Sequence, residues 1–312
     1  MTQDKPTVLI TGVTGFIGRY VARQLALMGW TTIGIGTRPP ENAPQQNLTH
    51  YYQLALPSSE LAAIIRHNEP QICIHCAGRA SVALSVEDPA ADFAVNADVT
   101  FSILNALRCW APQCKVINLS SAAVYGNPQS LPIREDHTPR PISPYGFHKL
   151  VGEQLCSEFS TVYGLPTASL RVFSAYGPGL RRQVLWDICY KIITQNRLNL
   201  SGTGNESRDF IHVLDVVNAI VAIATSELMN GDVYNLGTGQ EVTILALAQT
   251  ILEALDCDSI IPEFDGVAPE GTPLNWQADI TKLQSLGFSP SVPLDRGIKT
   301  FAYWCRAELV GA

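Results

Sequence analysis

Short apolar runs alternate along the chain with segments in which apolar residues recur every three or four positions. A short continuous apolar run is typical of a strand buried on both faces, and the wider spacing is typical of an amphipathic helix. Because strands and helices take turns, we expect an α/β fold with a doubly wound parallel sheet. The expected strands are residues 7–10, 31–35, 51–54, 71–77, 115–119 and 166–173.

The pattern changes after the strand at 166–173, which indicates a second unit. We assign residues 1–177, with about 208–237, to the sheet domain. Residues 178–207 and 238–312 are assigned to a smaller C-terminal α/β domain. In parallel sheets of this kind, ligands lie beyond the carboxyl ends of the strands. The candidate residues discussed below therefore come mostly from strand ends and the loops after them.

Composition narrows the class of protein. The 312 residues are 46% hydrophobic and 16% charged, which indicates a compact chain with a full core. The formal net charge of -7 argues against nucleic acid or an anionic membrane surface as the main partner. No apolar run is long enough to span a membrane, and the N-terminus enters a strand directly. We therefore expect no signal peptide and a cytoplasmic location.

The eight cysteines are scattered, and most lie in apolar runs. Cys73 and Cys76 form the sequence CIHC, but within an expected strand. Residues three apart on a strand point to opposite faces, so these two thiols are not expected to share a ligand. We expect no metal site, and free buried thiols in a reducing compartment.

A glycine-rich turn follows the first strand and reads TGVTGFIG. Gly12, Gly15 and Gly18 would allow a tight turn, close approach of the backbone to a pyrophosphate, and close packing of the next helix. The amides at the start of that helix would face the phosphates. Because the motif sits between a strand and a helix, it predicts dinucleotide binding in a Rossmann-type sheet.

The end of the second expected strand indicates which cofactor is bound. An acid at this position binds the adenosine ribose of NAD, whereas a basic residue suits the 2′-phosphate of NADP. Here the strand ends in Gly36-Thr37-Arg38, with no acid. We favour NADP(H), and NAD(H) stays open because the alternative is that Arg38 is simply a solvated loop residue. The residues expected to bind the cofactor are Gly12, Thr14, Gly15, Phe16, Ile17, Gly18, Thr37, Arg38, Ala77, Gly78 and Lys149.

Candidate acid–base chemistry lies between residues 120 and 149. Ser121 ends a strand, and Tyr145 and Lys149 are four apart on the next helix, so they share a face. A lysine ammonium beside a tyrosine favours the phenolate, and we expect the Tyr145 pKa to be lowered. Such a tyrosine exchanges protons with an alcohol or a ketone. Alone, the pair also fits an ordinary surface helix.

Other polar residues are candidates for the substrate side. Arg181 and Arg182 either clamp a diphosphate or form a solvated helix start. Asn96, on a long expected helix at 89–108, is either a buried amide bonded to the backbone or part of the active-site network, and we favour the structural role. The residues expected to contact the substrate are Ser81, Ser121, Ser174, Arg181, Arg182 and Arg208.

Taken together, the motifs resemble the extended short-chain dehydrogenase/reductase family, in its sugar-nucleotide epimerase/dehydratase branch. They follow the family's order across nearly the whole chain: TGVTGFIG, HCAG, SSAAVYG, YGFHK, RVFSAYGPG, RDFIHVLDV, YNLGTG and ADITKLQSLGF. The resemblance implies hydride transfer at C4 of a nucleotide-diphosphate sugar. It implies Tyr145 as acid or base, with Lys149 lowering its pKa and holding the nicotinamide ribose. Ser121 would hold the C4 oxygen, and Arg208 would bind phosphate. A homodimer through helices 89–108 and 144–163 is also implied.

Departures from the family pattern narrow the activity. The 4,6-dehydratases carry Asp-Glu where this chain has Ala122 and Ala123, so dehydratases and the related decarboxylases are rejected. The motifs look most like those of UDP-glucose 4-epimerases. Those enzymes usually carry Asp at Gly36, Asn at Ser174, and Arg and Asp at Pro269 and Thr272, and acids are common at Leu54 and Pro57. The changes suggest a different sugar or nucleotide.

Two other activities stay open. A nucleotide 4-keto-6-deoxysugar reductase would use the same Tyr145 and consume NADPH, which suits Arg38. A non-catalytic NADP-binding sensor or scaffold is the third interpretation.

Overall fold

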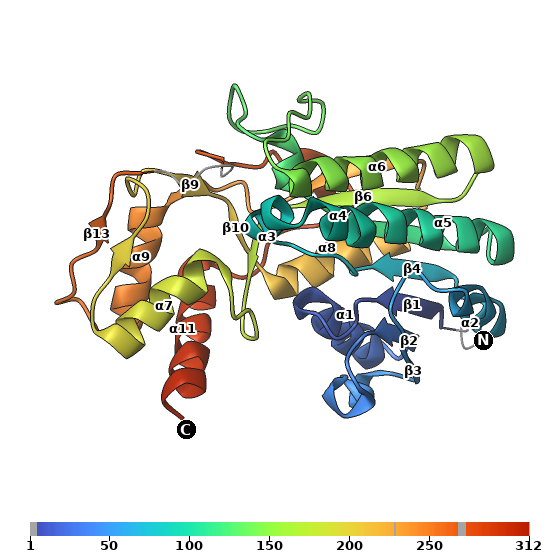
Figure 1. Cartoon of the computed structure of the whole chain (residues 1–312), viewed down its shortest axis with the longest axis horizontal. Coiled ribbons are helices and arrows are strands. Elements are labelled where there is room, and N and C mark those ends of the chain that lie inside the picture. Colours follow the sequence, from blue (N-terminus) through green and yellow to red (C-terminus); the bar gives the residue numbers. More distant parts are fainter. Residues whose placement is uncertain (1–4, 228, 268–272, 312) are drawn as a thin grey trace.

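The computed structural model describes residues 5–227, 229–267 and 273–311. Seven parallel strands form one sheet in the order β11-β6-β5-β4-β1-β2-β3 (Figure 1). The strand order reverses between β1 and β4, which confirms the doubly wound Rossmann-type sheet. The strands are β1 (Thr7–Thr11), β2 (Thr31–Gly36), β3 (His50–Gln53), β4 (Ile72–His75), β5 (Lys115–Ser121), β6 (Thr167–Val172) and β11 (Asp232–Leu236).

Helices cover both faces of this sheet. On one face α1 (Phe16–Leu27) and α8 (Val213–Thr225) pack on the strands. On the other face lie α2 (Glu60–Asn68), α5 (Val99–Trp110) and α6 (Pro144–Tyr163). Val8 and Ile10 of β1 belong to the first core, and Leu9 between them belongs to the second. The apolar runs are continuous because side chains on both faces are buried.

The cysteines of the CIHC sequence confirm this alternation. Cys73 is buried with α2, α5 and α6, whereas Cys76 packs against the core on the opposite face. Burial raises the pKa of the Cys76 thiol to about 12. The two thiols therefore point away from each other and are held in the unreactive protonated form.

The expected helix at 89–108 is a helix with an interruption. It consists of α4 (Pro89–Phe93), a π-helical segment η3 (Ala94–Asp98), and α5. Asn96 lies in the π segment, accepts from the Arg79 amide at 3.2 Å and donates to the Arg79 carbonyl at 3.1 Å. These bonds confirm the structural role of Asn96: it fixes the loop that follows β4.

A second apolar core lies beyond the carboxyl edge of the sheet, at the left of Figure 1. It is built mainly from α7 (Gln183–Gln195), α9 (Ile244–Ala254) and α11 (Leu294–Val310). None of the helices formed by the described residues is long and apolar enough to cross a membrane.

Short elements connect these larger ones. The strand pairs are β7 (Ser174–Tyr176) with β10 (Phe210–His212), β9 (Ser207–Arg208) with β12 (Val242–Thr243), and β8 (Asn199–Leu200) with β13 (Glu263–Phe264). The short helices are η1 (Pro40–Asn42), η2 (Gln45–Asn47), α3 (Val82–Glu87), η4 (Ala122–Tyr125) and α10 (Thr281–Gln284).

Candidate active site

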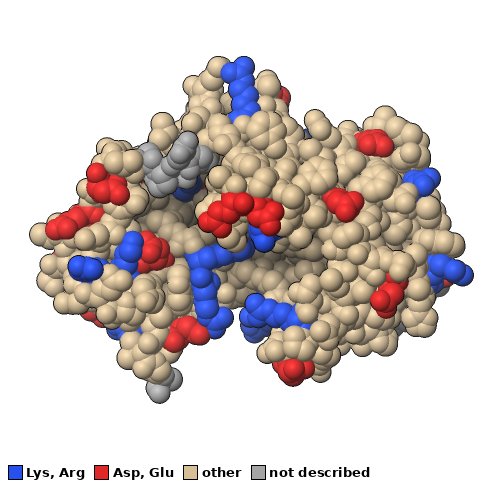
Figure 2. All heavy atoms as spheres, in the orientation of Figure 1, with Lys and Arg blue, Asp and Glu red and all other residues tan. Residues whose placement is uncertain are grey.

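A cavity of about 700 Å³ lies where the carboxyl edge of the sheet meets the second core. One wall comes from the glycine-rich turn, the ends of β4 and β5, and α6; the other comes from α7, β9 and Trp276. Figure 2 shows this hollow between the two parts of the molecule, with lysine and arginine side chains gathered at its rim. Its volume is in the range of ligand-binding clefts, about 300–1,000 Å³.

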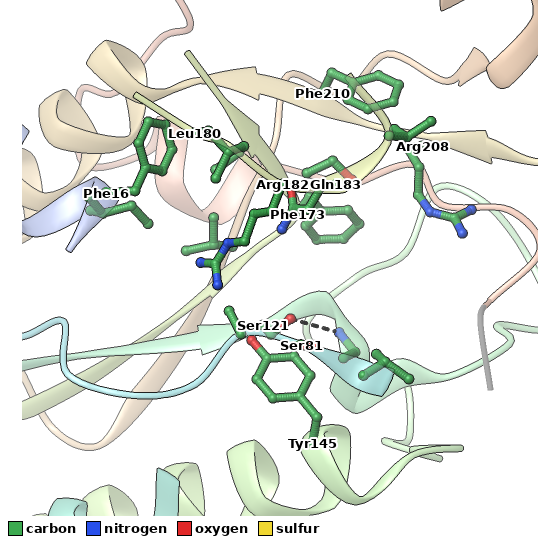
Figure 3. A pocket seen from close by; sticks show the side chains of 18 of the residues that line it. Phe16, Ser81, Ser121, Tyr145, Phe173, Leu180, Arg182, Gln183, Arg208 and Phe210 are labelled. Carbon is green, nitrogen blue, oxygen red and sulfur yellow. Dashed lines mark hydrogen bonds between the residues drawn. The ribbon is translucent and has the colours of Figure 1, made fainter. Parts of the chain in front are cut away.

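Ser121 and Tyr145 meet inside this cavity (Figure 3). Ser121 is the last residue of β5, and its hydroxyl accepts from the Ala123 amide at 3.2 Å. Tyr145 is placed by the start of α6, where Ser143 caps the helix and Pro144 occupies its first position. The Ser121 and Tyr145 side chains hydrogen-bond to each other. The predicted pairing of serine and tyrosine is therefore present in the folded chain.

Lys149 lies behind Tyr145, with its ammonium 6.0 Å from the centre of the phenol ring. It donates to the Leu119 carbonyl at 2.9 Å, and burial lowers its pKa to about 8. The prediction that the Tyr145 pKa is lowered is wrong when only the residues of this chain surround the phenol. Burial raises the pKa of the Tyr145 phenol, and the Ser121 hydrogen bond and the Arg182 charge oppose that rise. Desolvation of a phenolate here outweighs the nearby positive charge.

The glycine-rich turn fits a dinucleotide. Gly12 has a φ of +66°, and a Cβ there would lie 2.6 Å from the Ala77 nitrogen. A Cβ at Gly18 would overlap the Gly12 carbonyl oxygen. Within the described chain no side chain caps the N-terminus of α1, which begins after Gly15. Its free amides can therefore bind a pyrophosphate, and Gly15, Phe16, Ile17 and Gly18 line the cavity.

The remaining expected cofactor residues lie around this turn. Gly78 lines the cavity beside Lys149, and a Cβ on it would lie 3.2 Å from the lysine nitrogen. The Ala77 amide donates to the Thr11 hydroxyl at 3.3 Å, and Thr14 is buried at the base of the turn. These residues support the shape of the turn from behind.

Thr37 and Arg38 are exposed at the carboxyl end of β2. The Tyr51 hydroxyl donates to the Arg38 carbonyl at 2.5 Å, which fixes the backbone there. The positive charge of Arg38 also contributes to a lowered pKa of Arg19, after burial, so these two guanidinium groups are near each other. The end of β2 therefore presents positive charge rather than the acid that would bind ribose hydroxyls.

The two adjacent arginines separate. Arg182 lines the cavity, as do Ser81 and Ser174. Arg181 points to the outside, where it pairs with Glu308 at 2.6 Å and lies over the Trp304 ring. The expected diphosphate clamp of both arginines is thus not formed, because the ion pair to α11 holds Arg181 away from the cavity.

Arg208 lines the same cavity at the end away from Tyr145 (Figure 3). It lies over the Trp276 ring and donates to the Ser207 and Leu274 carbonyls at 2.6 and 3.0 Å. Burial lowers its pKa to about 10. A guanidinium held in this way is preorganised for an anion.

Ala122 and Ala123, the reason for excluding a dehydratase, have small and buried side chains. Ala122 is fully buried and Ala123 lines the cavity with a methyl group beside Ser121. Neither side chain can move a proton. Pro269 and Thr272, which replace nucleotide-binding residues of the family, lie outside the described residues.

A buried polar network behind the site was missed in the sequence. Glu153 of α6 accepts from the Ser120 hydroxyl at 2.5 Å and pairs with Arg171 of β6 at 2.7 Å. Arg171 also donates to Tyr125, whose hydroxyl donates to Asn235 of β11. The network joins the strand that carries Ser121 to the helix that carries Tyr145. The sequence spacing could have indicated this network, because Glu153 is one turn from Lys149 on the same helix face.

Comparison with known proteins places the chain in a family. The NAD dependent epimerase/dehydratase family matches residues 8–237, and the chain belongs to it. A putative UDP-glucose 4-epimerase of Methanocaldococcus jannaschii is 29% identical over 309 residues, covering 96% of this chain and 98% of that protein.

Two solved structures have a similar fold. The UDP-glucose 4-epimerase of Thermotoga maritima, solved with UDP-glucose, has a TM-score of 0.88 at 29% identity, covering 97% of this chain and 99% of that chain. The UDP-glucose 4-epimerase of Thermus thermophilus, in complex with NAD, has a TM-score of 0.86 at 28% identity, covering 97% and 100%.

Proposed function

We propose that this member of the NAD dependent epimerase/dehydratase family is an NAD(P)-dependent 4-epimerase of UDP-sugars. The observation that carries the proposal is the meeting of Ser121 and Tyr145 in one cavity with the uncapped N-terminus of α1. The similar solved enzymes, crystallised with UDP-glucose or NAD, support it. When bound, the nicotinamide would accept a hydride from the sugar and return it.

The residues of this chain would handle the proton. The Tyr145 hydroxyl would take the proton of the sugar C4 hydroxyl and later give it back, while Ser121 holds the same oxygen. Because burial raises the Tyr145 pKa, the phenolate, once formed, is the stronger base for taking the proton of the C4 hydroxyl. The Ser121 hydrogen bond and the Arg182 charge favour the phenolate needed in this step. Lys149 would hold the nicotinamide ribose.

Elimination of water is disfavoured by Ala122 and Ala123, which offer no acid or base beside the sugar. The second candidate is a nucleotide 4-keto-6-deoxysugar reductase, and the exposed Arg38 favours it because NADPH carries a 2′-phosphate. A non-catalytic sensor is the weakest candidate, since the serine, tyrosine and lysine are all in place.

For the cofactor we propose NADP(H) in preference to NAD(H). The support is the positive charge of Arg38 at the end of β2, where NAD-binding enzymes usually place an acid, together with the nearby Arg19 of α1. The remaining cofactor contacts are proposed for the turn at 12–18, for Thr37, and for Ala77, Gly78 and Lys149. The substrate contacts are proposed for Ser81, Ser121, Ser174, Arg182 and Arg208.

We also propose the assembly and location of the protein. We propose two domains, 1–177 with 208–237, and 178–207 with 238–312; the two cores on either side of the cavity support the division, while Leu283 and Phe288 reach into the sheet core and Tyr176 and Phe210 into the second core. Exposed apolar side chains support a homodimer through the helices 89–108 and 144–163: Phe93, Phe101, Phe147, Val162 and Tyr163. The free thiols support a reducing cytoplasm.

The test is to follow UDP-glucose, UDP-N-acetylglucosamine and UDP-glucuronate by NMR with the purified protein and added NAD or NADP. We expect a C4 epimer of at least one, with no net change in reduced cofactor. Tyr145→Phe should lower kcat by about 100-fold or more while the far-UV spectrum stays unchanged. Net consumption of NADPH with a 4-ketosugar would identify the reductase, and no product from any sugar would refute both enzymes.

A further inference from the structure

Arg182 occupies a distinctive place in the cavity. It precedes α7 with an extended backbone, and the next residue, Gln183, has a left-handed φ of +68°. A non-glycine residue in this region is uncommon and costs conformational energy. In Figure 3 the Arg182 side chain reaches from its own wall of the cavity toward Ser121 and Tyr145. The strained turn thus directs the Arg182 guanidinium toward Ser121 and Tyr145, while the Arg181 side chain points out of the cavity.

The acids of the cavity cannot neutralise this arginine. Asp187 is already paired with Lys191 at 2.7 Å. Glu206 accepts from the Thr203 and Gly204 amides at about 3.0 Å, so its carboxylate is also engaged. Across the described ranges of the chain, the Arg182 guanidinium has no ion pair or hydrogen bond, and the same holds for the Arg79 guanidinium after Gly78.

The proposed binding sites for the cofactor pyrophosphate and the substrate diphosphate lie in other parts of the cavity. The pyrophosphate of the cofactor has the turn at 12–18 and the N-terminus of α1. The diphosphate of the substrate would lie, as proposed above, at Arg208, which is held over Trp276 at the end of the cavity away from Tyr145. A neutral sugar at Ser121 and Tyr145 would cover Arg182 and leave its charge without a partner, which is unfavourable.

We propose that the sugar carries a carboxylate and that Arg182 binds it, so that the substrate is a UDP-linked uronic acid rather than a neutral hexose. The inference rests on the proposed function for the placement of the sugar. A guanidinium matches a carboxylate through two parallel hydrogen bonds, which makes it selective for this group over a hydroxymethyl group. Arg79 supplies further positive charge on the other wall.

UDP-glucose and UDP-glucuronate are a matched pair of probes, because they differ only in the group at C6. We expect kcat/KM for UDP-glucuronate to exceed that for UDP-glucose by about tenfold or more. Arg182→Gln should lower the ratio of kcat/KM for UDP-glucuronate to that for UDP-glucose by about tenfold or more, because both sugars lose the positive charge near Tyr145 but only the uronate loses the partner of its carboxylate. Arg182→Lys should retain most of the preference, and Arg181→Gln, on the outside, should leave the ratio unchanged.

Binding separates this inference from the proposed reaction. In the Tyr145→Phe protein loaded with cofactor, calorimetry should show the same preference in Kd without turnover. A preference in Kd with no epimer formed by the wild type would keep the uronate assignment and refute the epimerase. The assignment is overturned if UDP-glucose is bound equally well or better, or if neither sugar binds. It is also overturned if Arg182→Gln weakens both sugars alike, which would place Arg182 at the diphosphate, or if it weakens the cofactor instead.

Discussion

Lys149 should reduce the stability of the fold, and removing it should stabilise the protein. Its pKa falls from 10.5 to about 8 because the ammonium is buried. A shift of about 2.5 pH units corresponds to roughly 3 kcal/mol of unfolding free energy. The variant also loses the hydrogen bond of 2.9 Å from the lysine Nζ to the Leu119 carbonyl. This loss destabilises it by about 1 kcal/mol and offsets part of the gain. Lys149→Met, which keeps the length of the side chain, should therefore raise the unfolding free energy at pH 7 by about 2 kcal/mol.

The pH dependence follows from the same shift. Below pH 8 the lysine is charged in both states, and the folded protein bears the full cost of desolvating it. Between pH 8 and 10.5 the folded state loses the proton while the unfolded state keeps it, so the cost shrinks as pH rises. Above 10.5 the lysine is neutral in both states and this cost is gone. The unfolding free energy of Lys149→Met minus that of wild type should then fall from its value at pH 7 to zero or slightly below zero.

Urea unfolding of nucleotide-free protein, followed by fluorescence at pH 7, 9 and 10.5, measures this difference. Other groups titrate in both proteins, so the difference between the two curves is the relevant quantity. Lys299→Met, at an exposed lysine, is the matched control and should change stability little at each pH. A destabilising effect of Lys149 is ruled out if Lys149→Met is less stable than wild type at pH 7, or if the difference in unfolding free energy does not decline by pH 10.5.

Two further substitutions test the cofactor site and the buried network. Arg38→Ala should weaken NADP by about tenfold and NAD by less than about twofold in fluorescence titrations, because only NADP carries the 2′-phosphate; equal losses would show that Arg38 does not contact it. Glu153→Gln leaves Arg171 buried without a counter-charge and should lower the unfolding free energy by about 3–5 kcal/mol in urea. Asp136→Asn breaks the exposed pair with Arg134 and should cost less than about 1 kcal/mol, so similar losses for both variants would contradict the account.

The sheet could be predicted from the sequence because its signal is local. The apolar runs of β1, β2, β4, β5 and β6 are strands buried on both faces, and the glycine-rich turn follows the first of them, whereas the weaker run at β3 is a partly exposed edge strand. The meeting of Ser121 with Tyr145 was also predictable, since one residue ends a strand and the other begins the next helix. Such features depend on neighbours in sequence, which periodicity and turn chemistry describe well.

Other features depended on contacts that the sequence does not display. Arg181 leaves the cavity because of Glu308, which lies 127 residues further along the chain. The direction of the Tyr145 pKa depends on how fully the phenol is buried, and this is set by packing around η4 and Trp276. The π segment at Asn96 breaks a helix whose apolar pattern is continuous. Each of these is a tertiary effect that overrides a local preference.

The second core has a consequence for folding during synthesis on the ribosome. Its α7 packs on α11, whose inner residues Phe301, Ala302 and Cys305 are wholly enclosed. Because α11 ends at Val310, α7 must wait for more than a hundred residues to be synthesised before its apolar face is covered. The sheet can form earlier, since its last strand, β11, ends at Leu236. All seven strands are therefore made before the wall that carries Arg182 is covered, although Leu283 and Phe288 of the sheet core follow only shortly before α11. Loss of the C-terminal helix should thus remove substrate selection before it removes cofactor binding.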